Sequence, residues 1–130
     1  MAACALPECV VHGDAWVGNV VRTAGGPVLL DFERAPVGPP EWDLVSTAIA
    51  MTTTGAVTPA EYAEFCGADG TDVTEWEGYE LLAGAHELRM TTYAAQHAAT
   101  RPEWRAEAQY RVDCLRGRAE PRPWHWKRIM

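Results

Sequence analysis

The sequence predicts an α+β fold that is mainly α-helical, in which one β-hairpin is followed by four to five helices. Two short β-prone runs near the start of the chain flank a glycine-rich turn. From Pro39 onward, apolar residues recur at helical spacing, and several of these stretches begin with helix-capping residues. The chain has 130 residues, of which 48% are apolar, so we expect residues 1–130 to form a single domain.

The β-hairpin is predicted over residues 20–30. Residues 20–21 and 28–30 are valine and leucine, and the Ala-Gly-Gly-Pro sequence at residues 24–27 favours a tight turn between them. Pairing of the two runs would bring the residues at the open end of the hairpin side by side. Polar residues precede and follow the hairpin in the sequence, so this pairing would bring them close together.

Two helices are predicted next along the chain. Residues 41–51 carry apolar side chains near helical spacing. A second helix is expected to begin at Thr58, because the sequence Thr-Pro-Ala-Glu has the form of a capping box with proline at the first helical position. Both predictions depend on local sequence alone.

The longest helix is predicted over about residues 74–98, after a capping sequence at residues 72–75. Leu81 and Leu88 lie off its main apolar stripe, so we expect this helix to be buried on more than one face. A last helix is predicted over residues 102–117, where a glycine ends it. The two tryptophans of the tail that follows are expected to pack back on the domain.

Charged and histidine side chains of these helices are interpreted as structural. The arginines between residues 101 and 118 alternate with glutamates, which is typical of an ion-paired, solvated face. His86 and His97 are interpreted as hydrogen-bonded structural histidines rather than as ligands or bases.

Composition argues against several kinds of partner. A formal net charge of −7 speaks against a nucleic-acid backbone and against an anionic membrane. No apolar run approaches the ~20 residues of a membrane span, and the start of the chain lacks the features of a signal peptide, so we expect a cytoplasmic protein. Cys4, Cys9 and His12 have the spacing of half a zinc site, but no second close pair completes it. Reduced thiols are therefore the preferred interpretation.

The polar residues around the hairpin have the spacing of a phosphoryl-transfer site. His12, Asp14 and Asn19 follow the pattern H-x-D-x-x-x-x-N, and Asp31-Phe32 begins immediately after the hairpin. Transfer of a phosphoryl group from ATP to a hydroxyl requires a carboxylate at the acceptor and oxygen ligands for Mg²⁺. Kinase catalytic loops supply these groups in this order, with a second metal-binding aspartate in a later D-F element.

The joint pattern is specific, although each residue alone is not. Four fixed residues at this spacing, His12-Gly13-Asp14 and Asn19, are expected by chance in less than about one in a thousand chains of this length. The alternative is that Asp14 and Asn19 are ordinary turn residues, which both amino acids favour. The added Asp31-Phe32 supports the catalytic interpretation.

The amino-acid sequences of three segments resemble the motifs of one protein family. HGDAWVGNVV (residues 12–21), LLDFE (29–33) and GPPEWDL (38–44) resemble the aminoglycoside phosphotransferase and choline kinase-like family. The resemblance implies the helical C-terminal lobe of a protein-kinase-like fold, with ATP as phosphate donor and Mg²⁺ as cofactor. It also implies roles for individual residues: Asp14 as the catalytic base, Asn19 and Asp31 as metal ligands, His12 and Asp43 as structural supports of the catalytic loop, and Trp16 and Glu33 in the vicinity of the substrate.

Two departures from the family pattern qualify this reading. The family often has His-Pro where this chain has Trp16-Val17. The strand lysine of an N-terminal nucleotide-binding lobe has no counterpart here, since the only lysine is Lys127. We therefore expect that lobe to be absent from these 130 residues, which resemble the truncated second half of a kinase and should be inactive alone. The missing lobe, or self-association, is the expected macromolecular partner.

Two classes of function remain open. The first is a small-molecule kinase that phosphorylates a hydroxyl of an aminoglycoside-like or other small hydroxylated acceptor, such as a sugar, a choline-like alcohol or an amino alcohol. The second is a catalytically inactive remnant or interaction module that retains the catalytic loop.

Overall fold

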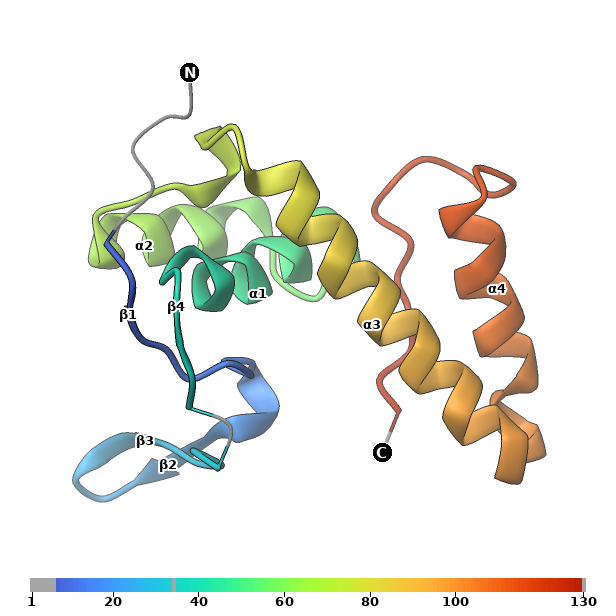
Figure 1. Cartoon of the computed structure of the whole chain (residues 1–130), viewed down its shortest axis with the longest axis horizontal. Helices are drawn as coiled ribbons and strands as arrows, with labels where there is room; N and C mark the ends of the chain where they lie inside the picture. Colours follow the sequence, from blue (N-terminus) through green and yellow to red (C-terminus); the bar gives the residue numbers. More distant parts are fainter. Residues whose placement is uncertain (1–6, 34, 130) are drawn as a thin grey trace.

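The computed structural model describes residues 7–33 and 35–129, and this part of the chain is α+β and mostly helical (Figure 1). Its four α-helices follow two small antiparallel sheets of two strands each. Short 3₁₀ turns, named η, connect some of these elements. In chain order the elements are β1 (Cys9–Val10), η1 (Val17–Asn19), β2 (Val20–Thr23), β3 (Gly26–Leu29), β4 (Val37–Gly38), α1 (Glu41–Thr52), α2 (Pro59–Asp69), η2 (Val73–Glu75), α3 (Tyr79–Thr100), η3 (Pro102–Trp104) and α4 (Arg105–Leu115).

The predicted hairpin is confirmed. Strands β2 and β3 pair with Val20 opposite Leu29 and Val21 opposite Val28, around a two-residue turn. Gly26 has a φ of 112°, a conformation that glycine adopts without the strain of a Cβ atom. The backbone N–H of Leu30 donates to the carbonyl of Asn19 at 2.7 Å, which extends the pairing to the open end of the hairpin.

A second sheet, which the sequence did not predict, closes the segment that carries the hairpin. β1 and β4 pair with Cys9 opposite Gly38 and Val10 opposite Val37. A strand of two residues is too short to show an alternating apolar pattern in the sequence. These two strands are recognised only by their pairing, which joins residues that are 27 or more positions apart. Cys9 is an exposed free thiol, and Cys4 lies outside the described residues.

The first two helices match their predictions closely. α1 buries Val45, Ala48 and Ile49, which form one face at helical spacing. At the start of α2, the side chain of Thr58 accepts from the Glu61 N–H and the Glu61 carboxylate accepts from the Thr58 N–H, so the capping box is present. A core cluster joins these helices to η2 and to the first half of α3.

The longest helix begins later than predicted, at Tyr79 rather than near residue 74. Asp72 caps the short turn η2 instead, and Trp76 then takes an extended conformation that interrupts the helical path. A Cβ atom on Gly78 would lie 2.4 Å from the Trp76 ring, so the glycine allows that ring to fold over the start of α3. The expectation for Leu81 and Leu88 was wrong, since these side chains are 78% and 56% exposed.

The last helix and the tail form the other part of the molecule. The tail returns along α3 and α4 and buries Trp124 and Trp126, as predicted (Figure 1). The expected solvated ion-pair face is corrected at one place, because Arg111 and Glu107 are buried and paired at 3.0 Å. The Arg111 guanidinium also donates to the carbonyl groups of Met90 and Lys127, so it ties α3, α4 and the tail together.

Within the described residues, no helix is both long enough and apolar enough to cross a membrane.

Candidate active site

A loop between β1 and β2 carries the predicted catalytic residues, and Asp43 holds its backbone. The two carboxylate oxygens of Asp43 accept hydrogen bonds from the N–H groups of His12 at 2.7 Å and of Gly13 at 2.9 Å. Asp43 lies in the first turn of α1, where a negative charge is also favoured by the helix dipole. Gly13 has a φ of 87°, so the loop bends here in a conformation that disfavours any residue with a Cβ atom.

The His12 ring joins the loop to the open end of the hairpin. Its Nδ1 accepts from the Asp14 N–H at 3.2 Å, and its Nε2 lies 2.6 Å from the carbonyl oxygen of Leu30. A carbonyl can only accept, so the pair of contacts requires the neutral tautomer with the proton on Nε2. The ring is buried and meets Phe32 edge-on, with 4.8 Å between ring centroids.

Asn19 holds Asp14 in place. Its side-chain NH₂ group donates to the backbone carbonyl of Asp14 at 2.9 Å and to the carboxylate Oδ2 at 3.2 Å. The turn between them is closed by hydrogen bonds from the Trp16 N–H to Asp14 and from the Asn19 N–H to Trp16. Oδ1 of Asp14 and the side-chain oxygen of Asn19 have no hydrogen-bond partner within residues 7–33 and 35–129.

Asp31 follows the hairpin, one residue beyond the backbone hydrogen bond between Leu30 and Asn19. It has a φ of 65°, in the left-handed region that is unfavourable for residues other than glycine, asparagine and aspartate. Its side chain is exposed, and the carboxylate has no hydrogen bond or ion pair with any other described residue.

These oxygen donors fit Mg²⁺ in kind. Mg²⁺ is commonly held by one or two carboxylates together with phosphate oxygens and water. The carboxylate of Asp31 and the side-chain oxygen of Asn19 are oxygen donors of the hard kind that Mg²⁺ accepts, and the hairpin brings their main chains together. In the described part of the chain, no three His, Cys, Asp or Glu side chains lie close enough together to hold a metal ion by themselves.

Trp42, His86 and Arg89 adjoin the loop, and sequence reasoning assigned them no place in the site. The indole N–H of Trp42 donates to the Gly13 carbonyl at 2.9 Å. The His86 ring stacks on that indole at 3.8 Å, and its Nε2 lies 3.2 Å from the Trp42 carbonyl. The Arg89 guanidinium lies over the same indole, 5.5 Å from its centroid. The available signal was the three-residue spacing of His86 and Arg89, which puts both on one face of α3.

The surroundings of His86 change the pKa of its imidazole. Burial lowers the pKa of the His86 imidazole below its usual value, and the nearby positive charge of Arg89 lowers it further. A hydrogen bond to the Trp42 carbonyl and the carboxylates of Asp14 and Asp43 act in the opposite direction on this pKa. The net effect favours a neutral imidazole at pH 7, so His86 contributes hydrogen bonding and packing there rather than positive charge.

The two residues expected near the substrate lie in different settings. Trp16 is 39% exposed, and the Arg128 guanidinium from the tail lies over its ring at 4.7 Å. Glu33 is exposed and makes no hydrogen bond or ion pair with another described residue. The structure therefore joins Trp16 to the tail and leaves Glu33 apart from the network around Asp14.

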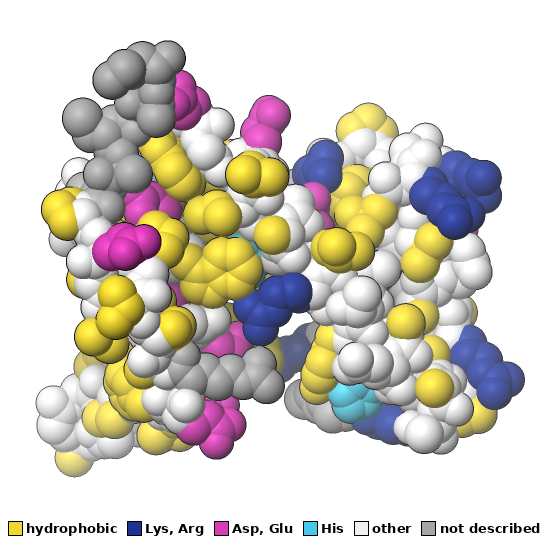
Figure 2. Space-filling model, viewed as in Figure 1, with side chains coloured by type: hydrophobic (Ala, Val, Ile, Leu, Met, Phe, Trp, Pro, Cys, Tyr) yellow, Lys and Arg dark blue, Asp and Glu magenta, His cyan; other side chains and the backbone are white. Residues whose placement is uncertain are grey.

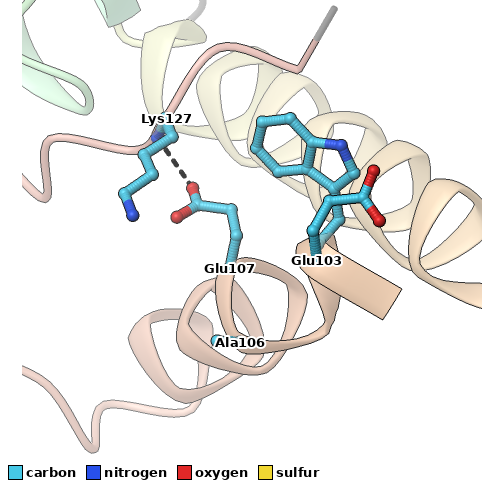
Figure 3. A pocket seen from close by; sticks show the side chains of 5 residues that line it. Glu103, Ala106, Glu107 and Lys127 are labelled. Atoms are coloured by element: carbon cyan, nitrogen blue, oxygen red, sulfur yellow. Dashed lines mark hydrogen bonds between the residues drawn. The ribbon is translucent and has the colours of Figure 1, made fainter. Parts of the chain in front are cut away.

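Two cavities lie outside the catalytic loop. One of about 260 Å³ is bounded by α4, η3 and the tail, where the Lys127 N–H donates to the Glu107 carboxylate at 2.8 Å (Figure 3). A second cavity of about 420 Å³ includes Glu87, whose carboxylate accepts two hydrogen bonds from Arg122 and one from Thr53. None of the loop residues lines either cavity.

Comparison with known proteins adds one finding. The family model described as the phosphotransferase enzyme family matches residues 1–82, which is more than half of the chain. The matched range contains the loop, the hairpin, α1, α2 and the start of α3. No curated protein and no solved structure matches the chain significantly.

Proposed function

The chain belongs to the phosphotransferase enzyme family, and from this premise we propose that it acts in ATP- and Mg²⁺-dependent phosphorylation of a hydroxyl group on a small molecule. Residues 1–130 would form the helical C-terminal lobe of a protein-kinase-like fold. Two observations support the proposal. Asn19 holds the carboxylate of Asp14, and the hairpin returns the chain so that Leu30, the residue before Asp31, is bonded to the backbone of Asn19.

Asp14 is the proposed base for the acceptor hydroxyl. Asn19 engages Oδ2, which leaves Oδ1 for a hydrogen bond from the acceptor O–H. Phosphoryl transfer forms a bond from the acceptor oxygen to the γ-phosphorus and breaks the bond from that phosphorus to the β–γ bridging oxygen. ADP leaves, and the hydroxyl proton passes to Asp14. A base positioned in this way contributes roughly 10²–10⁴-fold to the rate.

Asn19 and Asp31 are the proposed ligands of Mg²⁺. When bound with ATP, the ion would neutralise charge on the phosphate oxygens. Asn19 uses its NH₂ group on Asp14 and keeps its carbonyl oxygen for the ion, so one side chain sets the spacing between the base and the metal. Catalysis by positioning depends on such a fixed spacing, because a displacement of the reacting groups by about 1 Å can lower the rate roughly 10²-fold.

His12 and Asp43 are proposed to keep the loop rigid rather than to contact substrate. Asp43 binds two successive N–H groups of the loop, and His12 fixes the loop to the Leu30 carbonyl. Side chains that act through other side chains in this way limit the motion of the reacting groups.

An inactive interaction module is the second candidate, and one observation favours it. Both strands of the hairpin are exposed at every position except Gly26, with valine and leucine side chains 41–45% exposed. Phe32, immediately after the hairpin, is 56% exposed. A two-stranded hairpin is marginally stable alone, so an apolar surface of this kind suits contact with a partner protein or a second copy of the chain.

The decisive assay measures ADP release with Mg²⁺-ATP and a panel of amino sugars, sugars and amino alcohols. Residues 1–130 alone should give no turnover. When a nucleotide-binding lobe of the family is supplied, we expect acceptor-dependent turnover that falls about 10²–10⁴-fold in Asp14→Asn and is nearly abolished in Asp31→Asn. Asp69→Asn is the matched control, because Asp69 is an exposed carboxylate at the end of α2. Turnover that survives in Asp14→Asn would refute the assigned base.

Metal binding can be tested without turnover. In the presence of ATP, Mn²⁺ should broaden the NMR signals of the Asn19 side-chain NH₂ group and of the Leu30 amide. Asp31→Asn should remove this broadening, whereas Asp69→Asn should retain it. Absence of selective broadening together with absence of turnover for every acceptor would favour the inactive module.

A further inference from the structure

Two arginines from distant parts of the chain lie beside the catalytic loop. Arg89 comes from the middle of α3 and lies over Trp42, whose indole N–H is bonded to Gly13. Arg128 comes from the tail and lies over Trp16, two residues after Asp14. Each guanidinium is therefore held on an aromatic ring that is itself part of the loop or fixed to it.

Neither of these guanidiniums is neutralised by a neighbouring carboxylate. Arg89 and Arg128 form no ion pair or hydrogen bond with residues 7–33 or 35–129, although both side chains are exposed. By contrast, Arg111 and Arg122 are each bonded to a buried glutamate. A guanidinium stacked on an aromatic face keeps its N–H donors at the ring's edge available for a planar anion such as a carboxylate or a phosphate.

The chain as a whole is acidic, with a formal net charge of −7, so a pair of free cations near the proposed base is a local exception. Figure 2 shows basic side chains beside a broad hydrophobic side chain, at the furrow between the two halves of this face. Arg89 and Arg128 are the described cations held against Trp42 and Trp16, and the neutral form favoured for His86 adds no charge beside them. Each of these two guanidiniums attracts an anionic group placed against it and repels a cationic one.

We propose that Arg89 and Arg128 bind an anionic substituent, a carboxylate or a phosphate ester, of the acceptor while the acceptor hydroxyl lies at Asp14. The inference rests on the phosphotransfer proposed above and narrows its substrate class to small hydroxylated acids. Both arginines would select the acceptor and orient it. Phosphoryl transfer itself would use Asp14, Asn19 and Asp31.

The first experiment measures binding without turnover. The indole N–H signals of Trp42 and Trp16, assigned by replacing each tryptophan with phenylalanine, are followed during titration with glycerate, glycerol or 3-aminopropane-1,2-diol. These molecules share a carbon skeleton and differ in charge. We expect glycerate alone to shift both signals in the wild-type chain and in Arg105→Gln, the control for an exposed arginine on α4. In Arg89→Gln the Trp42 shift should disappear, and in Arg128→Gln the Trp16 shift should disappear.

The second experiment uses the same three molecules as acceptors with Mg²⁺-ATP, in the protein completed by a nucleotide-binding lobe of the family. Glycerate should give the highest kcat/KM, and Arg89→Gln should lower that value roughly ten- to a hundredfold through a raised KM for glycerate. The KM for ATP should stay unchanged, and Arg89→Lys should recover part of the loss. Arg89→Glu should shift the preference toward the aminodiol.

The outcomes separate this inference from the proposed function. Glycerate shifts that survive in both Arg→Gln variants, or that are absent in the wild-type chain, would overturn the anion site. A preference for the aminodiol in the wild-type chain would overturn it as well. An effect of Arg89→Gln on the KM for ATP alone would assign the arginines to the nucleotide phosphates instead. Specific glycerate shifts without turnover of any acceptor, even when the nucleotide-binding lobe is supplied, would uphold the anion site and refute the phosphotransferase.

Discussion

The isosteric change Asp43→Asn tests how the catalytic loop is held. Asp43 accepts from the N–H groups of His12 and Gly13, one with each carboxylate oxygen. Asparagine can accept only one of these bonds, and the other N–H would face an NH₂ group that cannot accept. A hydrogen bond to a charged group contributes about 1.5–3 kcal/mol. Because Asp43 is half-buried, solvent screens part of this, and we take about 2 kcal/mol for the loss.

The assay is amide hydrogen exchange read out residue by residue. A local loss of about 2 kcal/mol should speed exchange at the His12 and Gly13 amides about thirtyfold. Amides in the centres of α1 and α3 should be less affected, because the loop can open without unfolding the helices. Asp69→Asn is the control. Unchanged exchange at His12 and Gly13 would refute the role of Asp43, and an equal acceleration throughout the protein would show that Asp43 supports the whole fold rather than the loop.

Three further predictions concern other residues. Gly13→Ala should destabilise the loop by about 1–2 kcal/mol, because the φ of 87° is unfavourable for alanine, and the same exchange experiment should detect it. Burial lowers the folded-state pKa of His86, so the unfolded chain binds the proton first as pH falls. The free energy of unfolding should therefore decrease as pH falls below about 6.5. Urea unfolding at several pH values should show this decrease, and His86→Gln should make it smaller. Arg111→Met should cost about 3–5 kcal/mol in the free energy of unfolding, because it leaves the Glu107 carboxylate buried without its cation, and the double variant with Glu107→Gln should recover much of that loss.

The sequence correctly predicted those helices and turns whose formation is decided by residues close together in the chain. The capping box at Thr58 and the glycine-rich hairpin turn both formed, since each is decided within a few residues. The start of α3 was misjudged because Asp72 caps a short 3₁₀ turn, and only the fold of the Trp76 ring over Gly78 decides where the helix begins. Asp72 does act as an N-cap, but it caps η2 rather than α3.

Contacts between distant residues were not predictable in the same way. The spacing of Asp14 and Asn19 indicated that they act together, and their side chains do meet through a hydrogen bond. By contrast, Trp42 lies on α1 and His86 and Arg89 lie on α3, which begins 27 residues after α1 ends. The spacing of His86 and Arg89 puts them on one face of α3, but no local pattern relates that face to Trp42. The buried pair of Arg111 and Glu107 was read as solvated for a similar reason. Its burial comes from α3 and the returning tail rather than from its own helix.

The loop and the hairpin differ from the helical core in what stabilises them. Val45 and its neighbours are packed by apolar contacts, whereas the segment from His12 to Asp31 is held mainly by hydrogen bonds to Asp43, to Leu30 and from Trp42. A net hydrogen bond contributes only about 1 kcal/mol, and the hairpin buries little apolar surface in return for its ordering. This segment should therefore open at a lower free energy than α1 or α3. Ligands that bind Asp31, Asn19 and the exposed hairpin would add the missing contacts, so ordering of the segment and occupation of the site are expected to be coupled.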